Sequence, residues 1–244
     1  MEALVIELKT QSSTFRNPDF QNFHKSYQLP PPTTIVGLAG AAIGLSPQKS
    51  QEFFESENWK IGVYGESNGR SKDLWKFTKD VKKRQENVNQ NGAIDILTRE
   101  ILFFNRFIVV FSSDNLKKIN ELKLAFEMPK FALTLGNSDS IAKIMSVEII
   151  RSFVKSKYIQ NCLLDGDIIA EVISNINNAI EFSVYNTSEP ITYDLPVRFK
   201  YKSKYGERSI SKRKKISFIG AEMKLNIDKN GIRYKGTFIP LFDY

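Results

Sequence analysis

Short stretches in which apolar and polar residues alternate, or in which branched and aromatic residues cluster, recur along this 244-residue chain. Alternation and clustering of this kind are typical of β-strands. In the first 150 residues the pattern predicts five strands, at residues 3–9, 60–64, 99–112, 131–135 and 144–150. The last two flank the turn residues Gly136 and Asn137.

Two helices are predicted between these strands. Small and branched residues fill positions 33–44, where Thr33 and Thr34 follow three prolines and are candidate N-caps. Ser113 and Asp114 are candidate caps of a second helix that runs to about residue 126. The order is strand, helix, strand, strand, helix, strand. We therefore expect an α+β fold with the ferredoxin-like arrangement that the RNA-recognition motif also uses.

Residues 66–98 interrupt this order between the second and third strands. The segment is polar, has glycine and asparagine at both ends, and alternates in its middle. A structureless loop of this length is unusual in a compact domain, so an extended β-hairpin that projects from the sheet is the expected structure. Its cations are candidate RNA-binding residues, namely Lys76, Lys82, Lys83 and Arg84.

The pattern changes after residue 155. Regularly spaced branched residues predict a helix over residues 168–176, and strands dominate from there on. The pair Asn230 and Gly231 lies between two apolar stretches and is typical of a tight hairpin turn. The expected organisation is a domain of residues 1–155, which carries the insertion, and a smaller, mostly β part of residues 156–244.

The net charge of +8 is concentrated in one segment. Residues 198–215 carry nine basic residues against one acid, Glu207, which indicates an anionic partner. Aromatics and cations alternate along the first part of the segment. Both an edge strand protected by lysine and a phosphate-contacting stripe fit this pattern. The residues of this possible nucleic-acid or partner patch are Lys200, Lys202, Lys204, Lys212, Arg213, Lys214 and Lys215.

Several function classes are excluded by composition. No apolar run approaches the roughly 20 residues of a membrane-spanning helix, and the N-terminus lacks the pattern of a signal peptide. A single cysteine, Cys162, and a single histidine, His24, leave no zinc site, and a lone cysteine fits a reducing cytoplasm. Asp165 and Asp167 flank a glycine as in a turn and helix cap. We expect no metal, no cofactor, no membrane partner and a cytoplasmic location.

The loop before the first helix combines cations and aromatics. It contains Phe15, Arg16, His24, Lys25 and Tyr27, and such residues bind phosphates and unstacked bases. Three interpretations remain open. The loop binds RNA; or it forms a metal-independent ribonuclease site, with His24 or Tyr27 as the base and Lys25 at the phosphate; or it packs at the helix entry. For Arg16, base stacking and an ordinary surface position are both open.

Three stretches of the chain resemble the CRISPR-associated Cas-five family. The first, FRNPDFQNFHKSYQLPPPTTIVGLAGAAIGL, is similar to the Tyr-x-x-Pro-Pro segment and small-residue helix of that family. The second, PKFALTLGNSDSIA at residues 129–142, is similar to its Leu-Gly-x-Ser-(Glu/Asp) element, and the third is REILFF at residues 99–104. The resemblance covers the N-terminal part of the chain, and the C-terminal part is not recognisable.

The resemblance implies a ferredoxin-like domain with a projecting hairpin, called a thumb, that grips RNA. Gly136, Asn137 and Ser138 of the second stretch, and Arg106 on the third strand, join the candidate RNA-binding residues. The implied role is a non-catalytic subunit of a type I CRISPR surveillance complex (Cascade), most similar to type I-B. Such a subunit caps the five-prime handle of the CRISPR RNA and contacts the backbone subunit and the large subunit.

In that role the subunit meets target DNA only indirectly, because the guide RNA reads the sequence. One subtype of the family cleaves CRISPR RNA with tyrosine, lysine and histidine. Its later Lys-His pair has no counterpart in this sequence, where His24 is the only histidine. A metal-independent endoribonuclease that processes precursor CRISPR RNA is therefore the alternative function.

Overall fold

A central antiparallel sheet organises the first part of the chain. The computed structural model describes residues 1–78, 94–170, 190–203, 207–220 and 222–244. Four strands lie in the order β5 (Lys60–Thr78), β6 (Ile94–Ser113), β1 (Glu2–Ser13) and β7 (Lys143–Ile150). The strands predicted at residues 3–9, 60–64, 99–112 and 144–150 are confirmed, and each is longer than its apolar pattern because pairing continues into polar residues.

Helices α1 (Pro32–Ile43) and α3 (Leu116–Glu127) pack on one face of this sheet and confirm the two predicted helices. Their caps were predicted wrongly. Helix α1 begins directly at a proline and has no side-chain cap, since proline already holds the helical φ. For α3, the Asn115 side chain accepts the N–H of Lys118 at 3.3 Å, one residue after the predicted caps. A further helix, α2 (Pro47–Glu55), was not predicted.

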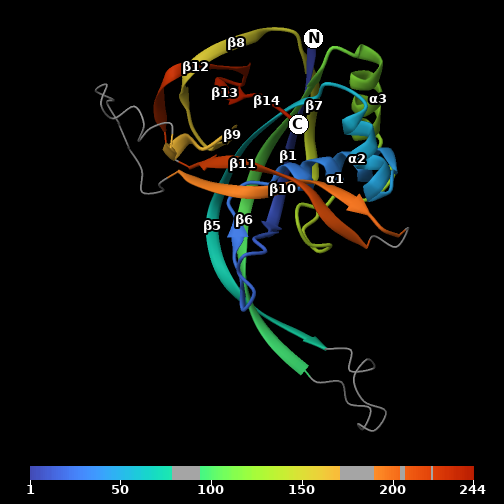
Figure 1. Ribbon diagram of the computed structural model, residues 1–244, viewed down its shortest axis with the longest axis vertical. Helices are drawn as coiled ribbons and strands as arrows, with labels where there is room; N and C mark the ends of the chain where they lie inside the picture. The colour runs from blue at the N-terminus through green and yellow to red at the C-terminus, as the bar shows by residue number, and fades with distance from the viewer. Residues whose placement is uncertain (79–93, 171–189, 204–206, 221) are drawn as a thin grey trace.

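A smaller sheet covers part of the opposite face. It consists of β8 (Phe153–Ile159), β12 (Met223–Tyr234) and β13 (Thr237–Pro240), and it lies at the end of the molecule away from the β5–β6 hairpin (Figure 1). Its apolar side chains pack on those of β1 and β6, which gives the central sheet a second core. The uncovered remainder of that face lies nearer the hairpin.

The C-terminal strands also extend the central sheet. Strands β9 (Cys162–Asp165), β11 (Arg208–Ile219) and β10 (Ile191–Tyr201) follow in order beyond β5, and β14 (Phe242–Asp243) pairs with β5 as well. The predicted division at residue 155 stays a prediction. In the described residues, β8 runs through that position and both parts share the sheet.

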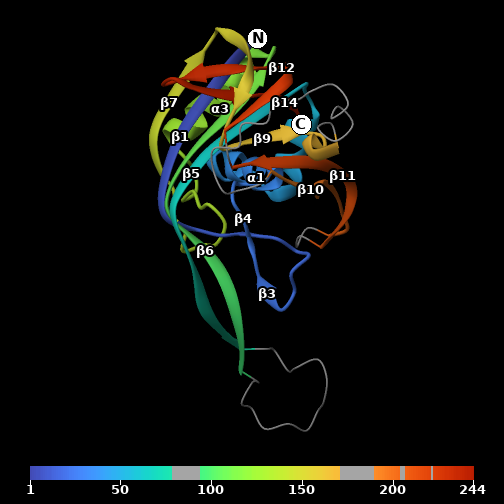
Figure 2. The same cartoon turned by 90° about the vertical axis from the view of Figure 1, so that its left-hand side faces the viewer.

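Strands β5 and β6 continue as a paired hairpin well beyond the body of the protein (Figures 1 and 2). The register is unbroken from Lys60 opposite Ser112 out to Thr78 opposite Ile94. The hairpin therefore occupies the described part of the insertion at residues 66–98. The predicted RNA-binding cations Lys82, Lys83 and Arg84 lie outside the described residues.

Three further predicted elements, at residues 131–135, 168–176 and 230–231, differ from the structure or are only partly described by it. The strand predicted at residues 131–135 is wrong: the chain turns back there and makes one isolated bridge, Thr134 to Ile141, while Leu133 and Leu135 enter the core. The hairpin turn predicted at Asn230–Gly231 is also wrong, because Gly231 pairs with Pro240 inside β12. Of the helix predicted at 168–176, residues 168–170 are helical and the rest lies outside the described residues.

The actual turn between β12 and β13 is Lys235–Gly236, with φ of 46° and 83°. Two consecutive positive φ values are typical of the type I′ hairpin turn. Glycine is needed at 231 for a different reason: a Cβ there would lie 2.2 Å from the carbonyl oxygen of Ile239. From an Asn-Gly pair in the sequence alone, a glycine in a hairpin turn cannot be distinguished from a glycine needed for the close approach of two strands.

Candidate nucleic-acid interface

The loop between β1 and α1 is held against the base of the β5–β6 hairpin by backbone pairing. Within the loop, β2 (Phe15–Arg16) pairs with β4 (Ser26–Tyr27). Between them, β3 (Phe23–His24) pairs in parallel with β6 at Thr98 and Arg99. The loop and the hairpin therefore form one continuous surface, and we call it the loop–hairpin interface.

A buried carboxylate, Glu100 of β6, joins the two parts of the loop–hairpin interface. One of its oxygens accepts the backbone N–H of Ser26 at 2.9 Å, and the other lies 3.3 Å from the guanidinium of Arg70 on β5. The Ser26 hydroxyl in turn accepts the N–H of Phe15 at 2.9 Å. Neither Arg70 nor Glu100 was among the residues predicted from the sequence.

Two of the predicted RNA-binding aromatics, Phe15 and Tyr27, are buried in the core. The Phe15 ring packs edge-on against Phe107 with centroids 5.6 Å apart. The Tyr27 ring stacks on Phe218 at 5.3 Å and meets Tyr193 edge-on at 4.8 Å. Burial raises the pKa of the Tyr27 phenol well above its ordinary value. Both rings therefore position the loop, and Tyr27 keeps its proton at neutral pH.

The other three loop residues reach the surface. Arg16 is exposed, and Lys25 is half-buried with its ammonium 5.1 Å from the centroid of the Phe20 ring. The half-buried His24 ring lies 6.3 Å from that of Trp75 on the hairpin. Burial, and then the nearby Arg16 charge, lowers the pKa of His24 below its ordinary value. His24 is therefore neutral at physiological pH.

On the hairpin, cations and aromatics interleave with those of the loop. Lys72 has its ammonium 5.5 Å from the centroid of the Phe23 ring, and Lys76 is exposed further along β5. Arg99 lies 5.6 Å from the centroid of Trp75 and bonds to Asp73 at 2.9 Å. The sequence contained the signal for Arg99 and Asp73, because an Arg and an Asp on paired strands attract each other, but only the register places them opposite.

The loop at residues 136–138 adjoins the same surface. Gly136 has φ of 108°, and a Cβ there would lie 1.9 Å from the carbonyl oxygen of Thr14. Its neighbours Asn137 and Ser138 are half-buried and exposed, respectively. Just beyond them, the Asp139 carboxylate lies 3.5 Å from Arg99. The structure thus brings residues 136–138 next to the start of the β1–α1 loop.

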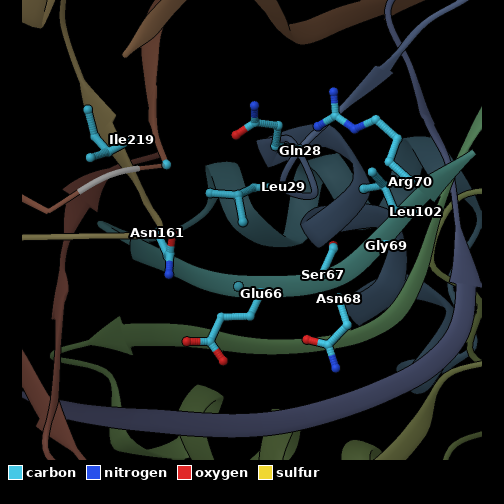
Figure 3. A pocket seen from close by; sticks show the side chains of 12 residues that line it. Gln28, Leu29, Glu66, Ser67, Asn68, Gly69, Arg70, Leu102, Asn161 and Ile219 are labelled. Atoms are coloured by element: carbon cyan, nitrogen blue, oxygen red, sulfur yellow. The ribbon is translucent and has the colours of Figure 1, made fainter. Parts of the chain in front are cut away.

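A hollow of about 400 Å³ opens beside this interface, at the edge of β5 (Figure 3). One wall is β5 from Gly65 to Arg70, and Gln28 and Leu29 at the end of the loop line another. Asn161 and Ile219 close the far side. Amide side chains and an arginine around a hollow of this size provide hydrogen-bond donors and acceptors for a polar ligand such as a nucleotide.

The remaining predicted residues lie elsewhere. Arg106 is on the opposite face of the sheet, where it bonds to Glu7 at 2.7 Å. In the basic 198–215 segment, Lys214 bonds to Asp165 at 2.9 Å, and Lys215 bonds to Asp167 at 3.1 Å. These acids neutralise part of the predicted patch. Arg213 lies near a further acid, Lys200, Lys202 and Lys212 are exposed, and Lys204 lies outside the described residues.

The described residues contain no group of acidic, histidine or cysteine side chains arranged to hold a metal ion. Asp167 instead accepts the N–H of Ala170 at 3.2 Å, as the predicted helix cap does. Cys162 is buried, and burial raises the pKa of its thiol. Among the described helices, none has the length and apolar character to cross a membrane.

Comparison with known proteins identifies the family. No curated protein matches the chain. Among the solved structures that share its fold is one described as a CRISPR RNA-guided surveillance complex. It has a TM-score of 0.52 at 14% identity over 90% of this chain and 91% of that one. Another, a CRISPR protein from Archaeoglobus fulgidus, has a TM-score of 0.53 at 13% identity over 100% of both chains.

A family profile, described as CRISPR-associated protein (Cas_Cas5), matches residues 3–211. The match covers far more than half of the chain. It includes the β1–α1 loop, the hairpin and strands β7 to β10, and so extends beyond the stretches that carried the resemblance. The chain therefore belongs to the CRISPR-associated Cas5 family.

Proposed function

We propose that this protein is a non-catalytic subunit of a type I CRISPR surveillance complex, most similar to type I-B. In this role it binds and caps the five-prime handle of the CRISPR RNA and joins the backbone filament to the large subunit. The β5–β6 hairpin is the thumb, and the order of β1, α1, β5, β6, α3 and β7 is the ferredoxin-like core.

The loop–hairpin interface carries this proposal. It presents the cations Arg16, Lys25, Lys72 and Lys76; on the face of β5 opposite Lys72 and Lys76, the partly exposed Trp75 ring lies beside His24 and Arg99. Lysine and arginine bind RNA phosphates, and aromatic side chains stack on unpaired bases. The Glu100 contacts and the β3–β6 pairing fix the two parts of the surface together, so that RNA meets a preformed site.

The geometry supports binding more than cleavage. A metal-independent ribonuclease needs a base and a second acid or cation at the same phosphate. Tyr27 is buried and keeps its proton, and the Lys25 ammonium lies over the Phe20 ring. The half-buried His24 is left as the one candidate base of the three. The alternative function, processing of precursor CRISPR RNA, therefore lacks an evident partner group for His24 in the described loop.

The proposal is tested by co-expressing the tagged chain with the other CRISPR proteins and the repeat array of its own locus. RNA that copurifies is sequenced and its five-prime ends are mapped. We expect RNA that begins with a repeat-derived handle. The double variant Lys72→Ala/Lys76→Ala should recover several-fold less of it, because two phosphate contacts are lost. The matched control, Lys117→Ala/Lys155→Ala, removes two exposed lysines of α3 and β8.

Equal handle recovery from both double variants would contradict the proposed site. An array transcript cleaved by the purified chain alone, with cleavage lost in His24→Ala, would favour the ribonuclease instead.

A further inference from the structure

Phe104 on β6 is unusual in both its backbone and its exposure. Its φ is 52°, a left-handed conformation, and its side chain is 68% exposed. Bulky side chains are disfavoured in this region, where glycine and asparagine are the usual residues. Exposure of a large aromatic ring to water adds a further cost. Stability alone would therefore favour another residue at this position.

The left-handed backbone itself has a structural cause. Before it, the even-numbered residues Glu100 and Leu102 are buried; after it, the odd-numbered Asn105 and Phe107 are buried. The alternation of side chains thus shifts by one residue at Phe104, although the register with β1 and β5 is unchanged. This shift explains the backbone conformation, but it does not explain why a phenylalanine occupies the site.

Next to Phe104, three cations form a row across the sheet. Lys9 on β1 is the cross-strand partner of Lys143 on β7 and of Arg106 on β6. Like charges directly opposite each other destabilise a sheet. Glu7 offsets only part of this charge, since it bonds to Arg106 at 2.7 Å and also to Lys235 at 2.6 Å. Lys9 and Lys143 are exposed and make no ion pair within the described residues.

The cation row and Phe104 line one hollow of about 550 Å³. Gln11 of β1 and Asn68 of β5 also line it, and Ile141 is its other exposed apolar residue. Glu66 and Asn68 line this hollow and also the one beside the loop–hairpin interface. Their side chains extend on the other side of the β5 ribbon from Ser67 (Figure 3). An RNA strand that crosses the edge of β5 would therefore pass from one hollow to the other.

We propose that this second hollow binds one nucleotide of a single-stranded RNA, with its base stacked on Phe104 and its phosphate over Lys9, Lys143 and Arg106. The proposal rests on the proposed function, which supplies the RNA. Phe104 and Arg106 are two residues apart on one strand, about 6.6 Å, which matches the separation of base and phosphate within a nucleotide. We infer RNA rather than a protein partner, because the row of cations requires an anion and the hollow exposes only a small apolar surface.

The test measures binding of a fluorescein-labelled octauridine RNA to the full-length chain by anisotropy. Phe104→Gly should bind about tenfold more weakly, because loss of one base–aromatic stack is of that size. It should melt no lower than the parent, because glycine relieves the left-handed backbone. Phe104→Trp should retain the parent affinity. The control, Phe131→Ala, removes a different exposed ring, 60% exposed, and should bind like the parent.

Unchanged affinity in Phe104→Gly, or no binding of the probe by the parent chain, would overturn this inference. The proposed function is judged separately, by handle recovery in Lys72→Ala/Lys76→Ala. If Phe104→Gly keeps its RNA affinity but loses a protein from the copurified complex, the hollow binds a protein and the inference is likewise wrong.

Discussion

The ring of Tyr27 lies on the ring of Phe218, with centroids 5.3 Å apart and planes 21° from parallel. Tyr27 ends β4 within the β1–α1 loop, and Phe218 belongs to β11, almost 200 residues later in the sequence. The C-terminal strands thus form part of the support for the N-terminal loop. Disruption of this stack should therefore alter the loop as well as the core.

Tyr27→Ala should lower the free energy of unfolding by about 3 kcal/mol or more, because it removes a buried aromatic ring. Tyr27→Phe keeps the ring and should cost far less. Urea unfolding of both variants measures the difference. Handle recovery should follow the same order, since the ring positions the loop. A loss of recovery in Tyr27→Phe equal to that in Tyr27→Ala would instead indicate a direct role for the hydroxyl.

The raised pKa of Tyr27 also predicts the behaviour at high pH. Its pKa in the folded state lies above the ordinary value of 10.0, so the unfolded chain loses the proton first. The stabilisation is complete below pH 10 and should decline as the pH rises above it. Absorbance of tyrosinate, followed from pH 9 to 12, should show Tyr27 ionising together with unfolding. The Tyr27→Phe variant serves as the reference.

Glu100→Ala should destabilise the protein by about 2–3 kcal/mol, because the buried N–H of Ser26 loses its acceptor and Arg70 loses its partner. Glu121→Ala, a change at an exposed helix position, is the control and should stay within about 0.5 kcal/mol. Chemical denaturation provides the measurement. Equal stabilities of these two variants would show that Glu100 does not fasten the loop to the hairpin.

The lowered pKa of His24 predicts that the stability of the protein depends on pH in the mildly acidic range. The pKa of His24 in the folded state is below the ordinary value of 6.5, so the unfolded chain takes up the proton first as the pH falls. The protein should be most stable above about pH 6.5 and should lose stability as the pH falls below it. In His24→Gln this part of the loss should disappear. Urea midpoints at pH 7.5 and 5.5 for both proteins give the comparison.

The hairpin should serve RNA binding rather than folding. Replacement of residues 77–95 by Asn-Gly joins Lys76 to Ile96, which are cross-strand partners, through a favourable two-residue turn. The contacts of Arg70 and Arg99 remain. The free energy of unfolding should therefore change by no more than about 0.5 kcal/mol, while recovery of handle RNA should fall. Full recovery by the shortened protein would exclude a role for the removed segment.

The sequence predicted local features of the structure better than contacts between residues that are far apart in the chain. Strands and helices with a strong local pattern were found, because alternation and helical spacing are visible within a few residues. Predictions failed where one local sequence pattern is compatible with two different structures. Asn230–Gly231 was predicted as a turn, yet Gly231 serves a close approach of two strands inside β12. Helix α1 has no side-chain cap where Thr33 and Thr34 were predicted, and the cap of α3 is Asn115, one residue after the predicted Asp114.

By itself the sequence determined the order of the main strands and helices, the position of a polar insertion between two strands, and a loop rich in cations and aromatics. Only the tertiary structure decided which of those side chains face solvent: it buried Phe15 and Tyr27, paired Glu100 with Ser26, and placed Arg106 on the opposite face. The reason is physical. Exposure and cross-strand neighbours depend on register between residues far apart in sequence, and register appears only once the sheet is assembled.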